Sequence, residues 1–322
     1  MSDKPTIDIT LDGAPRTIEA GTTGTLLLQD AVKKDGVVAM RVNGEPWDLD
    51  RQVPAGAVVE PITLSSEDGL NILRHSATHV MAQAVQEMFP GVDLGIGPFI
   101  TDGFYYDFGA IDAVTPEMLR EIEKRMKRIV KEGQRFVRRD ITEAEGREEL
   151  ADQPYKLELI TTKGAGAEGA SVEVGAGGLT MYDNVRRDGS VAWTDLCRGP
   201  HLPSTRLIGQ GFALTKSSSA YWKGDQSGDS LQRIYGTAWA SKDDLKAYQT
   251  RLAEAAKRDH RKLGAELDLY SFPEEIGPGL VVFHPKGAML RHQIEQYVVD
   301  RHQDYGFDFV HTPEISKGGL FH

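Results

Sequence analysis

The sequence predicts an α+β protein built from several domains. At 322 residues the chain is long enough for two or three domains, each with its own core. Strand-like and helix-like patterns follow one another along it, separated by turn signals rich in glycine. Hydrophobic residues make up 40% and charged residues 26%, which is typical of soluble globular proteins. A membrane span is not expected, because no run of about 18 apolar residues occurs.

The first sixty residues predict a small β-grasp domain. The stretch TIDITLDG alternates and ends in Asp12-Gly13, a hairpin signal, so PRTIEA is expected to return as its partner strand. Residues 22–36 predict a capped helix that is closed by Gly36. Two more strands follow, the first with Asn43-Gly44 at its turn. This order of strands and helix fits a β-grasp module, and its composition offers no catalytic constellation.

Helices and strands alternate in the middle of the chain. Ser65 or Ser66 is expected to cap a helix that runs to Phe89, and a glycine-rich, strand-like segment follows it. A basic helix begins near Thr115-Pro116. Residues 163–178 predict a flexible Gly/Ala loop, which lacks the Gly-Lys-Ser/Thr ending of a P-loop.

The last third of the chain predicts short strands and then a connector. Short strands are expected between residues 180 and 236, and a long charged helix over 241–263. A strand, a helix and a final strand complete the sequence-based assignment.

The net charge of the chain limits how it can bind nucleic acid. Its formal net charge of −11 argues against binding over the whole surface. Between residues 121 and 139, however, eight Lys/Arg face three Glu. We interpret this stretch first as the solvated face of an amphipathic helix, and a phosphate-binding surface is the alternative. The buried side of that helix is predicted to consist of Ile122, Met126, Ile129 and Val130.

The amino-terminal segment and the cysteine content indicate the expected cellular compartment. The start MSDKPTIDIT has no basic region followed by an apolar stretch, so no secretion signal is predicted. Cys197 is the single cysteine and cannot form an internal disulfide, which is typical of a cytoplasmic protein.

Two pairs of residues form the candidate site. His75 and His79 lie four apart on a predicted helix and therefore share one face. Cys197 and His201 are also four apart, but the Gly199-Pro200 bend between them predicts a loop. Two imidazoles from a helix and a thiol with an imidazole from a loop match the ligand set of tetrahedral zinc. The spacing alone does not decide between a zinc site, a metal-free catalytic site and coincidence. A zinc ion held by all four residues would be structural, because a catalytic zinc needs one coordination position free for water or substrate.

Two more residues are candidates for this site. Asp195 lies two positions before Cys197 and is expected to hold one histidine in its tautomer; the alternative is a surface carboxylate at a strand end. Lys156 stands beside apolar residues in PYKLELI, and near the site it would stabilise a developing oxyanion. Its alternative is an exposed lysine at the start of a strand.

Five long stretches resemble a known family. They are RHSATHVMAQAV, GIGPFITDGFYYDF, TDLCRGPHLPST, KSSSAYWKGDQSGDSLQRIYGTAW and AAKRDHRKLGAELDLYSF. In this order they resemble the amino-terminal half of bacterial threonyl-tRNA synthetases, over nearly the whole chain. Alanyl-tRNA synthetases and their free-standing deacylase relatives carry a similar His-x-x-x-His plus Cys-x-x-x-His set, but LQRIYGTAW and KRDHRKLG favour the threonyl family.

The resemblance implies four parts. Residues 1–63 would form the β-grasp domain called TGS, residues 65–240 an α/β editing domain and residues 241–263 a linker helix. Residues 264–322 would form the truncated start of a class II antiparallel-sheet catalytic domain, with motif 1 as the contact of a homodimer. Motifs 2 and 3, and the sites for ATP, magnesium and zinc of aminoacylation, would lie beyond residue 322. The chain is then expected to bind the acceptor end of tRNA(Thr) in the cytoplasm without charging it.

The resemblance also implies a reaction, the hydrolysis of seryl-tRNA(Thr). Serine lacks one methyl group of threonine, and a binding pocket gains only about 1–3 kcal/mol from that difference, so a second site must remove the wrong product. The family's editing site is considered to work without metal, which overrules the preference for zinc drawn from spacing. The residues assigned to its pocket are His75, His79, Lys156, Asp195, Cys197 and His201.

Further partners and functions stay open at this point. Four aromatic residues are candidates to stack on the terminal adenine, and core packing is the alternative for each of them. They are Tyr105, Tyr106, Tyr221 and Trp222. Besides the deacylase, a non-catalytic tRNA-binding or regulatory module and a zinc-dependent hydrolase of unrelated substrates are alternative functions.

Overall fold

The computed structural model describes residues 5–162, 178–315 and 319. The chain divides into two compact units, Met1–Ala247 and Tyr248–His322. The α+β class with several sheets is confirmed, whereas the four narrower domain limits remain predictions. The Gly/Ala loop expected over 163–178 lies, but for its last residue, outside the described residues.

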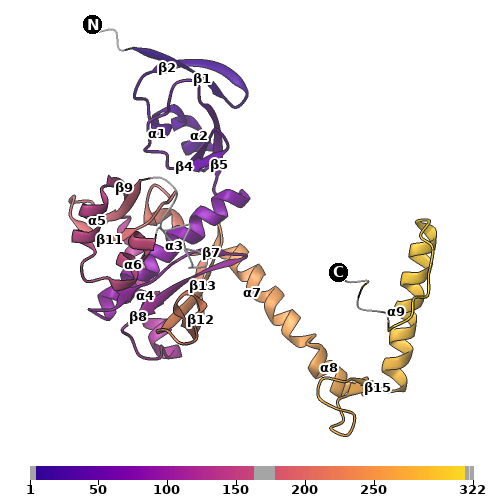
Figure 1. Cartoon of the computed structure of the whole chain (residues 1–322). Helices are drawn as coiled ribbons and strands as arrows, with labels where there is room; N and C mark the ends of the chain where they lie inside the picture. The colour runs from indigo at the N-terminus through magenta and orange to yellow at the C-terminus, as the bar shows by residue number, and fades with distance from the viewer. Residues whose placement is uncertain (1–4, 163–177, 316–318, 320–322) are drawn as a thin grey trace. The chain divides into compact units, whose positions relative to one another are not determined.

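A five-stranded sheet opens the first unit (Figure 1). Its order is β2-β1-β5-β3-β4, with β1 and β5 parallel and the other neighbours antiparallel. The strands are β1 (Thr6–Leu11), β2 (Ala14–Glu19), β3 (Val37–Val42), β4 (Glu45–Trp47) and β5 (Val58–Thr63). The one helix expected here is two short helices, α1 (Gly24–Leu27) and α2 (Gln29–Lys34), because Leu28 leaves helical geometry at φ −103° and ψ 16°.

The long helix α3 (Glu67–Met88) follows this sheet and forms the centre of the first unit. Ser66 caps it by accepting a hydrogen bond from the Gly69 amide at 3.1 Å, and Phe89 ends it, as the sequence predicts. Its residues are buried almost without a break from Ile72 to Val85. A helix buried on all sides holds its polar side chains away from water, and both candidate histidines lie on it.

Two sheets complete the first unit. One has the order β12-β13-β8-β6, with β7 also paired to β8, and α3 packs against β8 and β13. The other has the order β11-β10-β9. Their strands are β6 (Asp93–Leu94), β7 (Phe99–Ile100), β8 (Gly103–Gly109), β9 (Arg135–Ile141), β10 (Leu179–Val185), β11 (Val191–Leu196), β12 (Phe212–Tyr221) and β13 (Ser230–Ala238). The helices between them are α4 (Pro116–Glu132), α5 (Glu143–Glu149), α6 (Pro154–Thr162) and the short η2 (Thr205–Ile208) and η3 (Trp222–Gly224).

The basic helix is amphipathic, as expected. Thr115 caps α4, and Gly133 ends it in the left-handed conformation at φ 67°. The four residues predicted to face inward are its buried residues. Several cations of its outer face pair with carboxylates one turn away, among them Lys124 with Glu121 at 2.5 Å and Lys127 with Glu123 at 2.6 Å. Most of this helix is therefore a solvated face.

The second unit is small and begins inside a helix. The connector predicted over 241–263 is broken into α7 (Lys242–Lys257) and α8 (His260–Glu266), because Asp259 caps a new helix there. The strand pair β14 (Tyr270–Ser271) and β15 (Val282–Phe283) precedes α9 (Pro285–Asp304). The strand expected after α9 is wrong for the described residues 305–315, which form no strand. No helix in the described part of the chain is both long and apolar enough for a membrane span.

Candidate active site

The two predicted pairs converge on one buried cluster. One potential ligand atom from each of His75, His79, Cys197 and His201 lies within 4.8 Å of the others. Nε2 of His75 is 3.0 Å from Sγ of Cys197, and Sγ is 3.3 Å from Nε2 of His201. All four residues are buried, with at most 3% of their surface exposed. Segments that are more than a hundred residues apart in the sequence therefore form one site.

The Cys197–His201 segment is a tight loop, as the sequence predicts. It follows β11 and contains a cis peptide bond between Gly199 and Pro200. A side chain at position 199 would meet Tyr182, since a methyl group there would lie 2.0 Å from the Tyr182 hydroxyl, and the backbone also holds φ at +70°. Only glycine satisfies both constraints, so this residue brings the loop close to the cluster.

Stacked rings fix the orientation of His201. Its ring lies parallel to those of His75, with centroids 4.4 Å apart, and Phe136, with centroids 4.9 Å apart. Nδ1 of His201 is 3.1 Å from the Ser76 hydroxyl, which leaves Nε2 directed at Cys197. Ser76 also accepts from the Leu202 amide at 3.0 Å. Sequence reasoning missed Ser76 because a serine inside a helix gives no signal of its own.

Lys156 and Asp195 form a buried ion pair beside the histidines. Nζ of Lys156 is 3.0 Å from Oδ1 of Asp195, and both side chains are fully buried. The Tyr106 hydroxyl donates to Oδ2 of the same carboxylate at 2.6 Å. Lys156 lies on α6 and not at the start of a strand, so the alternative of an exposed lysine is wrong. Asp195 is the penultimate residue of β11 and is fully buried, so the alternative of a surface carboxylate is wrong; its described partners are Lys156, Tyr106 and the Leu196 amide, and not a histidine.

Burial makes the three imidazoles weak bases. Desolvation lowers the pKa of His75 to about 4, with a further contribution from the positive charge of Lys156. Burial is the main cause that lowers the pKa values of His79 and His201 well below the ordinary range; His75 and Lys156 add to it at His79, and His79 and His75 add to it at His201. Burial also raises the pKa of Asp195, while Lys156 and Tyr106 oppose that rise. The site therefore holds neutral imidazoles, which are able to accept a proton, next to a lysine and a carboxylate.

The segment that follows β4 also contributes to the site, through Asp48. Oδ1 of Asp48 accepts from the His201 amide at 2.8 Å, and Oδ2 accepts from the Tyr182 hydroxyl at 2.6 Å. Burial raises the pKa of Asp48, and these two hydrogen bonds oppose the rise. A cavity of about 130 Å³ adjoins this contact and is lined by both Asp48 and His201. No sequence signal pointed to Asp48, because its partners lie more than 130 residues away.

The four aromatic candidates lie in different surroundings. Tyr105 and Tyr106 are buried, and Tyr106 serves the ion pair described above. Tyr221 is 48% exposed and lines a cavity of about 240 Å³ together with the buried Trp222 and Arg233. Adenine stacking therefore has an accessible aromatic face only at Tyr221 among the four.

The cluster fits zinc by its donor set. Three imidazoles and one thiolate match a tetrahedral shell, whose neighbouring ligand atoms lie about 3.5 Å apart. The distances of 3.0 and 3.3 Å to Sγ approach that value. Nδ1 of His79 is buried and has no hydrogen-bond partner among the described residues. With all four ligands engaged, an ion would be enclosed and would join α3 to the loop.

Comparison with known proteins identifies the family of the chain. A family model described as "Threonyl and Alanyl tRNA synthetase second additional domain" matches residues 178–235, which include Asp195, Cys197 and His201. The chain is 71% identical over 319 residues to the threonine--tRNA ligase of Cutibacterium acnes, covering 98% of this chain and 46% of that protein. It is 58% identical over 325 residues to the threonine--tRNA ligase of Micrococcus luteus, covering 100% of this chain and 48% of that protein.

A further relative extends the same relation. The threonine--tRNA ligase of Thermobifida fusca is 57% identical over 327 residues, covering 100% of this chain and 49% of that protein. The chain thus spans about half the length of the curated relatives it matches. With identities of this size over almost all of its residues, the chain belongs to the threonyl-tRNA synthetase family.

Proposed function

We propose that this chain carries an editing activity that hydrolyses seryl-tRNA(Thr) and spares threonyl-tRNA(Thr). The observation that supports it most directly is the convergence of His75, His79, Cys197 and His201 beside the Lys156–Asp195 pair. Neutral bases, a cation and an ordered carboxylate in one buried place are the groups that ester hydrolysis requires. The match to an additional domain of threonyl- and alanyl-tRNA synthetases supports an aminoacyl ester of tRNA as the substrate class.

The proposed reaction uses water as the nucleophile. A water molecule held by an imidazole attacks the ester carbonyl, the carbon–oxygen bond to the ribose breaks, and the water proton passes through the imidazole to the leaving ribose oxygen. Lys156 stabilises the negative charge on the carbonyl oxygen, and Asp195 holds Lys156 in place. Cys197 shapes the pocket in this scheme and forms no covalent bond.

A zinc site is the second reading of the same cluster. The observations that favour it are the four buried donors within 4.8 Å and the unpartnered Nδ1 of His79. His75, His79, Cys197 and His201 would hold the ion, and a closed shell of four would supply stability in place of an activated water. One zinc per purified chain, measured by elemental analysis, would replace the metal-free scheme by this one.

The activity of the longer relatives is a separate proposal. Their name denotes the ligation of threonine to tRNA, and a protein that includes this chain together with motifs 2 and 3 is expected to do the same with ATP, magnesium and zinc. In that protein residues 1–63 would be the TGS domain, and residues 264–322 would begin the class II domain with motif 1 at a dimer contact. tRNA(Thr) would be the partner in the cytoplasm.

The test is to incubate the chain with both charged tRNAs. Seryl-tRNA(Thr) should lose its ester at least 100-fold faster than threonyl-tRNA(Thr), and His75→Ala or His201→Ala should abolish this loss, since proton transfer contributes roughly 100- to 10,000-fold. Tight binding of tRNA with both esters intact would instead support the non-catalytic binding module. Hydrolysis of unrelated esters but not of seryl-tRNA would support the zinc-dependent hydrolase.

A further inference from the structure

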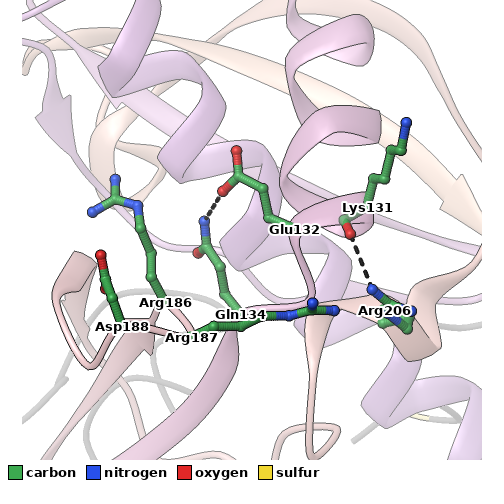
Figure 2. Close-up of a pocket in the computed structure, with 7 residues that line it drawn as sticks. All are labelled: Lys131, Glu132, Gln134, Arg186, Arg187, Asp188 and Arg206. Carbon is green, nitrogen blue, oxygen red and sulfur yellow. Dashed lines mark hydrogen bonds between the residues drawn. The ribbon is translucent and has the colours of Figure 1, made fainter.

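A second group of charged residues lies on the surface of the first unit. It lines a hollow of about 450 Å³, which we call the basic hollow. Figure 2 shows its seven lining residues, with Arg187 extending toward Arg206. These residues are Lys131, Glu132, Gln134, Arg186, Arg187, Asp188 and Arg206. The hollow is thus locally positive in a chain whose formal net charge is −11.

Three separate elements contribute these cations. Lys131 lies in the last turn of α4, Arg186 and Arg187 follow β10 in its turn to β11, and Arg206 lies on η2. Arg187 and Arg206 approach the same point of the backbone, because a methyl group at Gly133 would lie 3.7 Å from Nη2 of Arg187 and 3.2 Å from Nε of Arg206. The fold therefore gathers like charges that repel one another, an arrangement that favours an anion as their partner.

The two carboxylates of the hollow have other partners. Glu132 accepts from the Gln134 side chain at 2.8 Å and pairs with Arg128 at 3.5 Å. Asp188 accepts from both the amide and the hydroxyl of Ser190, at 2.9 and 2.7 Å, within the hairpin turn.

The cations, by contrast, are exposed and form no close ion pair in the described part of the chain, although the charge of Arg186 acts on Asp188 from a longer distance. None of Lys131, Arg186, Arg187 and Arg206 forms an ion pair with any carboxylate in the described part of the chain. Among the described residues, the Arg206 guanidinium donates to the Lys131 carbonyl at 3.3 Å, and the Arg186 guanidinium donates to the Ser190 hydroxyl at 3.4 Å. Their hydrogen-bond donors are thus available to an external anion.

Composition indicates which anion. The seven residues include no aromatic side chain, so the hollow offers nothing on which a base can stack. Arginines in a fork match the oxygens of a phosphate group. The segments that line the hollow also continue into the site: β11 leads from the arginine turn to Cys197, and Arg206 follows His201 by five residues. Short stretches of chain therefore connect the hollow to the site, so an RNA bound at one can also contact the other.

We propose that the basic hollow binds a backbone phosphate of the tRNA, with Arg186 and Arg187 as its main contacts. This inference rests on the proposed function for the identity of the RNA, but it concerns binding and not hydrolysis. A contact to phosphate sets the register of the acceptor end relative to the site and reads no bases. The hollow accounts for RNA binding by an acidic protein through a local patch.

The test compares two double variants of the full chain. Arg186→Gln/Arg187→Gln removes two charges from the hollow, whereas Arg120→Gln/Lys124→Gln removes two charges from the exposed face of α4, where each is paired with its own glutamate. Affinity for uncharged tRNA(Thr) is measured by fluorescence anisotropy over a series of salt concentrations. The hollow variant should bind about 10-fold more weakly, and its plot of log affinity against log salt should lose about one unit of slope per phosphate contact. The control variant should stay within about twofold of the unchanged chain, because its charges are already neutralised by neighbours.

Each other outcome decides the question. Equal losses of tRNA affinity in both double variants would show that only the total charge matters, and would contradict the proposed phosphate contact. An unchanged salt slope in the hollow variant would contradict it too, and so would a lack of measurable tRNA binding by the unsubstituted chain. If inorganic phosphate binds the hollow at constant ionic strength while the substitutions leave the affinity for tRNA unchanged, the hollow is a site for free phosphate. That result would contradict the proposed RNA contact. Because uncharged tRNA is the probe, a chain that binds through the hollow yet hydrolyses no ester would contradict the proposed function alone.

Discussion

The buried site and the basic hollow use similar charged groups in opposite ways. Lys156 and Asp195 are fully buried and 3.0 Å apart, because a charge taken out of water must find a partner. The arginines of the hollow are exposed and lack carboxylate partners among the described residues, since water stabilises each of them. Chemistry is therefore expected where the charges are desolvated, and salt-dependent binding where they are not.

The largest expected difference between the two regions lies in stability. Lys156→Met leaves the Asp195 carboxylate buried without its cation, which should lower the free energy of unfolding by about 3–5 kcal/mol and abolish seryl-tRNA hydrolysis. Arg187→Gln in the hollow should change stability by no more than about 0.5 kcal/mol. Urea unfolding of both variants gives the two values. Similar losses of unfolding free energy in the two variants would contradict the distinction between buried charges that need a partner and exposed charges that do not.

Acid should reveal the next difference, through the buried histidines. The folded pKa of His75 is about 4, below its ordinary value of 6.5, so the unfolded chain binds the proton more readily. The free energy of unfolding is therefore at its full value above pH 6.5 and decreases as the pH falls toward 4. The decrease due to His75 alone is about 3 kcal/mol. Urea unfolding at several pH values measures this slope. His75→Gln should flatten it, and an equally steep slope in that variant would assign the acid sensitivity to other groups.

A smaller effect is expected where the segment after β4 contacts the site. Asp48→Ala removes the acceptor of the His201 amide and the Tyr182 hydroxyl, which should cost about 1–3 kcal/mol and slow hydrolysis through misplacement of His201. Asp48→Asn keeps a carbonyl oxygen for the amide and should recover part of the rate. Asp50→Ala is the matched control, because Asp50 is exposed and its described side-chain partner is Thr25. Equal rates for both alanine variants would remove Asp48 from the site.

Local signals predicted the elements that carry the site. Ser66 and Thr115 mark the starts of α3 and α4 because caps act within one turn. The four-residue spacing of His75 and His79 predicts a shared face, and the pair lies on one side of a buried helix. Residues 305–315 were expected to include a strand, but strand formation depends on pairing partners, and the described residues there form none.

Long-range contacts explain what the sequence did not reveal. Lys156 was open to two interpretations, because its partner Asp195 lies 39 residues further along the chain. Asp48 and Tyr182 meet across 134 residues, and neither carries a motif. The spacing of the residues could predict that the two pairs are suitable ligands for the same ion. Only the fold, however, brings Nε2 of His75 within 3.0 Å of Sγ of Cys197.

The smallest effect is expected from Cys197→Ser. If water attacks the ester directly, the thiol is not a nucleophile, and hydrolysis of seryl-tRNA should continue within about 10-fold of the original rate, whereas removal of a true nucleophile costs far more. The serine hydroxyl also keeps an acceptor for the Gly199 amide, which donates to Sγ at 3.2 Å. A zinc site predicts the opposite result, because loss of a thiolate ligand would release the ion and lower the free energy of unfolding. Rates, unfolding curves and metal content of this single variant therefore separate water attack, covalent catalysis and a metal centre within the buried cluster.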